Sequence, residues 1–289
     1  MGFVFAIVCS FFNAVVDALR KKLVQGSNEY IAFWGLVLFS LPVFLIAVFL
    51  TGWPEIGRNF YIVVPIGVVI NIVASLMIFK ALKVSPLSLT IPFLAFTPVF
   101  LILTSFLMLR EIPNVYGLIG IILVTLGAYT LNISKAKEGF WEPIKAIKKE
   151  RGSFYALIVS FIFSIGANID KIAIKNSSPT AYPLVFYLTI LIVMSLIIFS
   201  RFKIKDIISA TRNNFKLYIA AGVFLGLAII FQLLSVARIL VAYTISIKRA
   251  GFIFAVIFGY LFFKEKEFGS RFLGAIVMVI GVLLITLLG

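Results

Sequence analysis

The chain has 289 residues, of which 62% are hydrophobic and only 13% are charged, and its net charge is +15. A soluble domain usually has about a quarter charged residues, and the mean hydropathy here is +1.16, so the composition excludes an ordinary water-soluble fold. The basic residues are spread over short gaps between apolar runs, which argues against nucleic acid as a partner. The chain has no histidine and Cys9 is its only cysteine, so we expect no metal site and no cofactor.

The apolar residues occur in runs of roughly twenty, which is the length that a helix needs to cross a hydrocarbon layer of about 30 Å. Barrel strands would instead place polar residues at every second position. We therefore predict an all-α membrane protein with ten transmembrane helices. The runs cover about 3–20, 30–50, 60–80, 86–109, 114–133, 153–170, 181–200, 215–236, 240–263 and 269–288.

The first run begins at the N-terminus and resembles a signal peptide in its apolar content. It lacks a basic leading segment, and it ends at Asp17 and the cluster Arg20-Lys21-Lys22, where a signal peptide would have a small-residue cleavage site. We therefore interpret it as the first membrane helix.

A few isolated polar side chains interrupt the apolar runs. In membrane helices such groups form interhelical hydrogen bonds or line a water-filled cavity. Both interpretations are open for them, and we name them as predicted cavity-lining residues: Asn13, Asn71, Asn168, Gln232 and Thr244.

The longest polar stretch, residues 134–152, divides the chain into two parts of similar length, 1–133 and 153–289. It is either a short helix in the membrane interface or a disordered linker. We predict that this basic linker separates two five-helix repeats.

Sliding residues 80–131 forward by 154 positions aligns the two parts without a gap. The charged and glycine matches carry the comparison, because apolar matches mean little in so hydrophobic a chain. Arg110-Glu111, Gly120 and Gly127 align with Lys264-Glu265, Gly274 and Gly281, and a shift of 153 aligns Asp17 with Asp170.

Each repeat has an odd number of helices, so the second repeat begins on the opposite side of the membrane from the first. The repeats are therefore predicted to be inverted, an architecture that recurs in transporters. The great majority of the 26 Lys and Arg residues follow helices 1, 3, 5, 7 and 9. By the positive-inside rule those loops are cytoplasmic, and both termini are predicted to be extracytoplasmic in a multi-pass protein of the cell membrane.

Lys248 and Arg249 are adjacent within the ninth run, about nine residues from its start, which places them near mid-membrane at roughly 1.5 Å per residue. A cation at that depth costs on the order of 3 kcal/mol. One interpretation is a water-filled cavity in which the pair binds a substrate carboxylate or phosphate. The alternative is a salt bridge to Asp17 or Asp170 on another helix, or snorkelling to the interface.

Two five-helix halves, with a basic-acidic pair after each fourth helix (Arg110-Glu111 and Lys264-Glu265) and a glycine-spaced fifth helix, resemble EamA-type proteins of the drug/metabolite transporter superfamily. The resemblance covers nearly the whole chain and implies a ten-helix carrier that exports or exchanges metabolites such as amino acids. The Lys248-Arg249 pair is also similar to the lysine-arginine pair of the phosphate and nucleotide-sugar translocator branch, which implies contact with a substrate phosphate. Many members of the superfamily are assigned cytoplasmic termini, contrary to the charge count here.

We therefore predict a secondary transporter, an exporter or exchanger, of small metabolites that include amino acids, organic acids or phosphorylated compounds. Its partners are a small solute and membrane lipids, and the oligomeric state is left open. The alternatives are a flippase of lipids or lipid-linked phosphates and a membrane scaffold without transport. We expect no enzyme activity, because the usual catalytic bases are missing.

Overall fold

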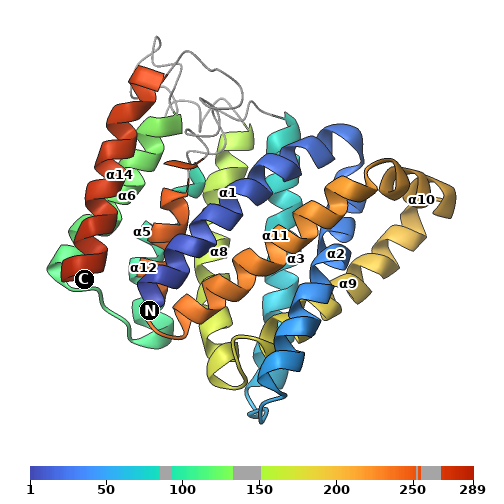
Figure 1. The fold of residues 1–289 in the computed structure, drawn as a ribbon, viewed down its shortest axis with the longest axis horizontal. Helices are drawn as coiled ribbons and strands as arrows, with labels where there is room; N and C mark the ends of the chain where they lie inside the picture. Colours follow the sequence, from blue (N-terminus) through green and yellow to red (C-terminus); the bar gives the residue numbers. More distant parts are fainter. Residues whose placement is uncertain (85–92, 133–150, 252, 255–267) are drawn as a thin grey trace.

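The computed structural model describes residues 1–84, 93–132, 151–251, 253–254 and 268–289, and these residues contain helices but no strand (Figure 1). The helices are α1 (Gly2–Gly26), α2 (Glu29–Thr51), α3 (Phe60–Val84), α5 (Thr97–Leu109), α6 (Val115–Asn132), α8 (Arg151–Lys175), α9 (Ala181–Arg201), α10 (Ile204–Asn213), α11 (Phe215–Val236), α12 (Val241–Ala250) and α14 (Phe268–Leu288).

Six helices are long and apolar enough to cross a membrane: α1, α2, α3, α8, α9 and α11. Three shorter apolar segments, 97–109, 115–130 and 273–288, add to them. The all-helical membrane fold is thus confirmed, and the count of ten spans stays a prediction. The predicted linker and the Lys264-Glu265 pair lie almost wholly outside the described residues.

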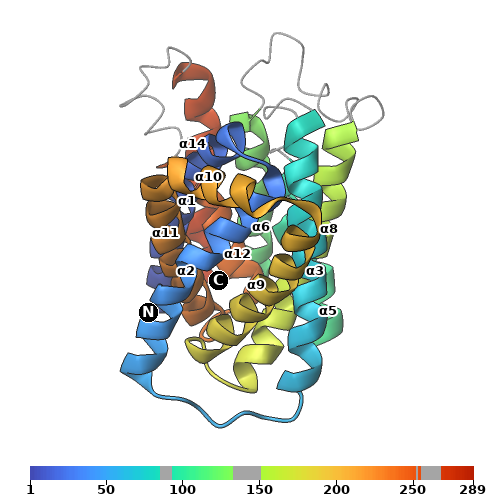
Figure 2. The same ribbon diagram turned by 90° about the vertical axis from the view of Figure 1, so that its right-hand side faces the viewer.

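Successive long helices run back and forth between two ends of the molecule (Figures 1 and 2). The turn at 27–28 and the connection 202–214, which contains α10, lie toward the upper end of Figure 1, and the loops 52–59, 110–114, 176–180 and 237–240 lie at the lower end. The helix α1 runs upward, whereas α8, its counterpart in the second half, runs downward. Equivalent helices of the two halves therefore have opposite directions.

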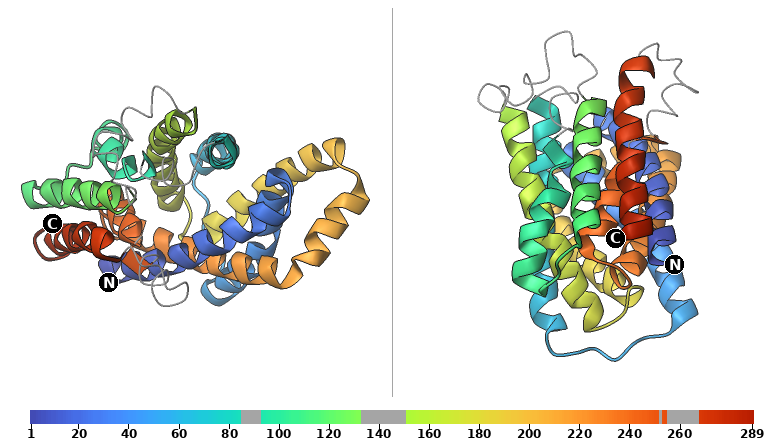
Figure 3. Two further views of the ribbon diagram at one scale, coloured as in Figure 1. Left: turned by 90° about the horizontal axis from the view of Figure 1, so that it is seen from above. Right: turned by 90° about the vertical axis from the view of Figure 1, so that its left-hand side faces the viewer.

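Helix packing follows the same relation. The pair α1 and α11 is matched by α8 and α3, which hold the equivalent positions in the other half, and α6 packs along α14. Seen from above, α6 and α14 lie at one side of the molecule and α10 lies at the other (Figure 3).

The glycines that align in the sequence bring α6 and α14 together. A Cβ atom on Gly281 would stand 2.7 Å from the carbonyl oxygen of Gly120, and one on Gly127 would stand 2.7 Å from that of Gly274. Small residues permit such close approach of membrane helices. Because residue 120 meets 281 while 127 meets 274, the two helices are antiparallel.

The outer surface is apolar. Large side chains are widely exposed on α2, where Phe49 is 88% exposed and Leu50 75%, and on α9, where Leu196 is 70% exposed. An exposed apolar surface of this extent would cause aggregation in water, and it is the expected surface of a protein surrounded by lipid. Buried polar side chains lie inside the bundle, among them Thr244 and Ser246 of α12.

Candidate functional site

The helix α12 carries Lys248 and Arg249 and packs against α1, α5 and α6. Its first seven residues, 241–247, are buried, as is Ala250. Lys248 and Arg249, in the last turn of the helix, are partly buried.

The hydrogen-bond partners of the two cations are neutral. Lys248 Nζ donates to Gln232 Oε1 of α11 at 2.6 Å, and Arg249 Nη2 donates to Thr97 Oγ1 of α5 at 3.1 Å. Arg249 Nε is buried and has no hydrogen-bond partner in the described part of the chain. Within the described residues neither cation forms an ion pair with a carboxylate.

The start of α5 positions the oxygen that Arg249 contacts. Pro98 lies in the first turn of α5, where backbone N–H groups have no acceptor within the helix, so proline costs no hydrogen bond there. The Thr97 hydroxyl donates to the carbonyl oxygen of Leu94 at 2.7 Å, which leaves its lone pairs free to accept from Arg249.

The two aspartates that the sequence offered as counter-ions have other partners. Asp17 accepts from Arg20 at 3.3 Å and from Asn13 Nδ2 at 3.0 Å, all on α1. Asp170 accepts the phenolic proton of Tyr182 at 2.6 Å. The salt-bridge alternative for Lys248 and Arg249 thus finds no support among the described contacts.

These groups nevertheless share one region. Asp17 and Arg20 lie within electrostatic range of both Lys248 and Arg249, and Asp170 lies within range of Lys248. The region, which we call the central charged cluster (Asp17, Arg20, Asp170, Lys248 and Arg249), has three cations and two anions. Its members come from α1, α8 and α12, so both halves of the chain contribute to it.

The predicted cavity-lining residues fall into two groups. Gln232 and Asn13 belong to the surroundings of the central charged cluster through Lys248 and Asp17. Thr244 lies one turn before Lys248, is buried and shares a hydrogen bond of 2.8 Å with Ser235.

Two asparagines lie apart from that cluster. Asn168 is buried and joins α8 to α5, because it donates to Thr104 at 3.0 Å and accepts from Ser105 at 2.7 Å. Asn71 has a long contact of 3.4 Å with Ser75 on its own helix α3. Their cavity-lining role stays a prediction.

A second polar network lies at the lower end of the bundle. Glu111 forms an ion pair of 2.5 Å with Lys171 of α8. It also accepts a hydrogen bond of 3.1 Å from the backbone N–H of Val241, the first residue of α12. Lys171 also donates to the carbonyl oxygen of Ile239 at 2.8 Å. Glu111 thus ties the first half of the chain to two helices of the second.

The chain turns sharply to present Glu111. Arg110 ends α5 with φ 60°, in the left-handed conformation, which costs a residue with a Cβ atom roughly 1 kcal/mol. Its N–H bonds back to the carbonyl oxygen of Phe106 at 3.1 Å. The basic-acidic motif is therefore a helix end followed by an interhelical contact.

Sequence reasoning missed Thr97 and Arg20 as neighbours of the cationic pair. Arg20 reads as an ordinary loop cation, and Thr97 as one of many threonines. The only available signal was the i,i+3 spacing of Asp17 and Arg20, which brings both onto one face of α1.

Comparison with known proteins supports both the fold and a family. A solved structure described as "Crystal structure of protein" is 14% identical, covers 99% of this chain and 96% of its own, and has a TM-score of 0.77, which supports the fold alone. The comparison with curated proteins gives no match. Residues 1–133 and 150–287 each match the profile of the EamA-like transporter family. The chain therefore belongs to the EamA-like transporter family, a family of membrane transporters of small solutes.

Proposed function

We propose that this protein is a secondary transporter, an exporter or exchanger, of small metabolites that carry a carboxylate or phosphate, and that Lys248 and Arg249 bind this anionic group. The observation that carries the proposal is that two adjacent cations inside the bundle have only neutral hydrogen-bond partners in the described residues. A substrate anion would supply the missing negative charge.

The chemistry of the two side chains supports an anionic ligand. A guanidinium group binds a carboxylate or phosphate through two parallel N–H donors, and an ammonium group adds a point charge. Arg249 uses Nη2 toward Thr97, while its buried Nε has no partner among the described residues, so one donor of the fork is unused. Each such charge-assisted hydrogen bond contributes about 1.5–3 kcal/mol.

The acidic members of the central charged cluster favour a particular kind of anion. Asp17 and Asp170 lie near the cations, so an ammonium group on the same substrate would find negative charge within the same cluster. Amino acids combine both groups within a few ångströms. They therefore fit the cluster better than simple organic acids or sugar phosphates, which lack the ammonium group.

Counterflow into proteoliposomes tests this function. Vesicles loaded with unlabelled serine, glutamate, succinate or glucose 6-phosphate should take up the same labelled compound, with the amino acids giving the largest signal. Lys248→Ala and Arg249→Ala should each reduce counterflow at least ten-fold at normal insertion levels. Arg58→Ala, which removes an exposed cation from the 52–59 loop, is the matched control and should retain the rate.

Two results would reject the proposal. Equal loss of insertion in both variants would assign the cations a structural role, and full counterflow in both would remove them from the substrate path. Lipid scrambling by the wild-type vesicles without any counterflow would favour the flippase alternative.

A further inference from the structure

A cavity at the edge of the bundle, which shares no lining residue with the central charged cluster, lies between α2, α10 and the start of α11. It has a volume of about 440 Å³ and is lined by Trp34, Ile207, Ile208, Thr211, Arg212 and Phe215. We call it the α10 groove. Four of its six lining residues are apolar, and Arg212 is the only charged one.

The helix α10 is amphipathic and connects two membrane helices, α9 and α11. Ile207 is 4% exposed and packs inward, whereas Ile204 and Ile208 are 63% and 58% exposed. Exposed isoleucines on a short helix with basic neighbours are typical of a helix that lies in the membrane interface. The α10 groove therefore opens where acyl chains meet headgroups.

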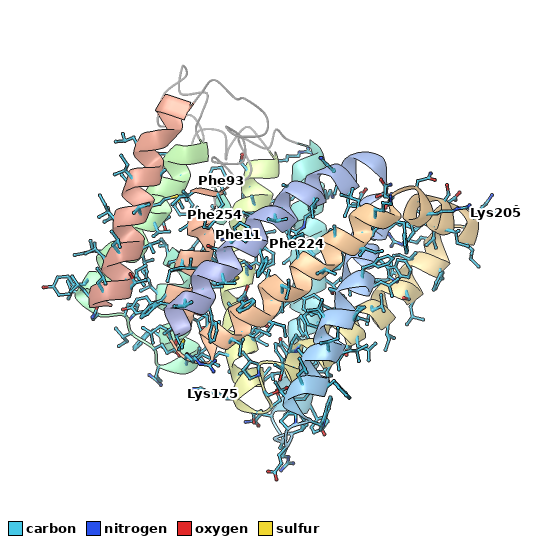
Figure 4. All side chains as sticks on the ribbon, in the orientation of Figure 1. Phe11, Phe93, Lys175, Lys205, Phe224 and Phe254 are labelled. Atoms are coloured by element: carbon cyan, nitrogen blue, oxygen red, sulfur yellow. The ribbon has the colours of Figure 1, made fainter. Side chains whose placement is uncertain are left out.

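The segment around α10 is strongly basic. It includes Arg201, Lys203, Lys205, Arg212 and Lys216 against a single acid, Asp206. Lys203, Lys205, Arg212 and Lys216 are exposed, and within the described part of the chain none of these four forms an ion pair. Lys205 projects outward at the far tip of α10 (Figure 4). Such a surface attracts anionic lipid headgroups.

Aromatic side chains hold the wall of the α10 groove in place. The Trp34 indole N–H donates to Ser195 Oγ of α9 at 2.8 Å, and its ring meets that of Phe199 edge-on at 6.5 Å. Arg201 lies 5.5 Å from the centre of the Tyr30 ring. Tryptophan and tyrosine at this level form the aromatic belt of membrane proteins.

We infer that the α10 groove is a binding site for one anionic phospholipid, with an acyl chain against Trp34, Ile208 and Phe215 and the phosphate at Arg212. The acyl chain of such a lipid matches the apolar wall of the groove, and its phosphate matches the guanidinium group of Arg212. A zwitterionic phospholipid supplies the same chain but no net charge for the basic segment. The inference concerns a surface away from the transport site and does not depend on the proposed function.

Trp34 provides a direct measurement of this site. The chain has three tryptophans, so the double variant Trp53→Phe/Trp141→Phe leaves Trp34 as the only one. Its fluorescence should be quenched more strongly by brominated phosphatidylglycerol than by brominated phosphatidylcholine at equal mole fraction in reconstituted vesicles. One cation near an anionic surface changes affinity about five-fold, and we expect selectivity of at least that size.

Charge-neutral variants locate the headgroup. In the background that retains only Trp34, Arg212→Gln should reduce the preference for phosphatidylglycerol about five-fold, whereas Arg58→Gln at the opposite end should leave it unchanged. Equal quenching by the two lipids, or an unchanged preference in Arg212→Gln, would overturn the inference. Absence of quenching by either lipid would overturn it too, because it would mean that acyl chains do not reach the groove.

Discussion

Two lysines inside this bundle have opposite surroundings. Lys171 is 8% exposed and meets the Glu111 carboxylate at 2.5 Å, with the Ile239 carbonyl oxygen as a second acceptor. Lys248 is also largely enclosed, yet its described acceptor is the neutral amide oxygen of Gln232 at 2.6 Å. The same side chain is thus charge-neutralised at one place, whereas at the other it forms no ion pair with any of the described residues.

The difference separates a structural ion pair from a candidate ligand site. A buried cation is tolerated when a carboxylate and further hydrogen bonds satisfy it, and removing one partner then leaves an uncompensated charge. A cation with neutral partners has unused electrostatic capacity, which is the condition for binding an anion. Identical substitutions at the two lysines therefore test the comparison directly.

The largest effect is expected for Lys171→Met. It leaves the Glu111 carboxylate without its cation and the Ile239 carbonyl oxygen without a donor, which should cost about 3–5 kcal/mol. The loss is measured as a lower thermal unfolding midpoint of the purified protein in detergent, followed by tryptophan fluorescence.

The double variant Glu111→Gln/Lys171→Met provides the control for that result. The amide oxygen introduced at position 111 would still accept the Val241 N–H, while both charges would be gone, and replacing a buried pair by neutral groups is often nearly neutral. Most of the lost stability should return. If the double variant were as unstable as Lys171→Met, packing and not charge would explain the loss.

The sequence predicted much of this fold for identifiable reasons. Long apolar runs separated by charged gaps predict helices that cross a membrane. The matching glycines at 120, 127, 274 and 281 predict a repeat, and in the structure all four lie where α6 contacts α14. The Lys248-Arg249 pair is recognisable because cations in an apolar run are rare.

The contacts of the site residues could not be predicted from the sequence, because they join segments that are far apart along the chain. Arg249 meets Thr97 across 152 positions, and Glu111 meets Val241 across 130. Lys171 lies near the end of its run and reads as a loop cation, so only the fold brings it to Glu111. A single sequence contains no signal for such pairings.

A smaller effect on stability is expected for Lys248→Met, the matched substitution at the unpaired lysine. It removes a cation that pairs with no carboxylate of the described residues and leaves the Gln232 amide oxygen without a donor. The lost hydrogen bond costs about 1 kcal/mol of stability, and removing an enclosed charge offsets that cost. The free energy of unfolding should change by at most about 1 kcal/mol in either direction, as measured by the same thermal unfolding experiment. A loss as large as that of Lys171→Met would show that Lys248 is paired after all.

The smallest effect is expected for Thr97→Val, which removes the oxygen that orients Arg249 and keeps the size of the side chain. The guanidinium group retains its charge but loses one fixed contact, worth about 1 kcal/mol, so the KM for the transported solute should rise about three- to five-fold while the maximal rate changes little. Thr189→Val is the matched control, because among the described residues the Thr189 hydroxyl bonds to the carbonyl oxygen of Val185 on its own helix at 2.8 Å. A fall in the maximal rate with unchanged KM would mean that Thr97 acts on the conformational change between the repeats and not on the orientation of Arg249. An equal rise of KM in both variants would show that the effect does not pass through Arg249.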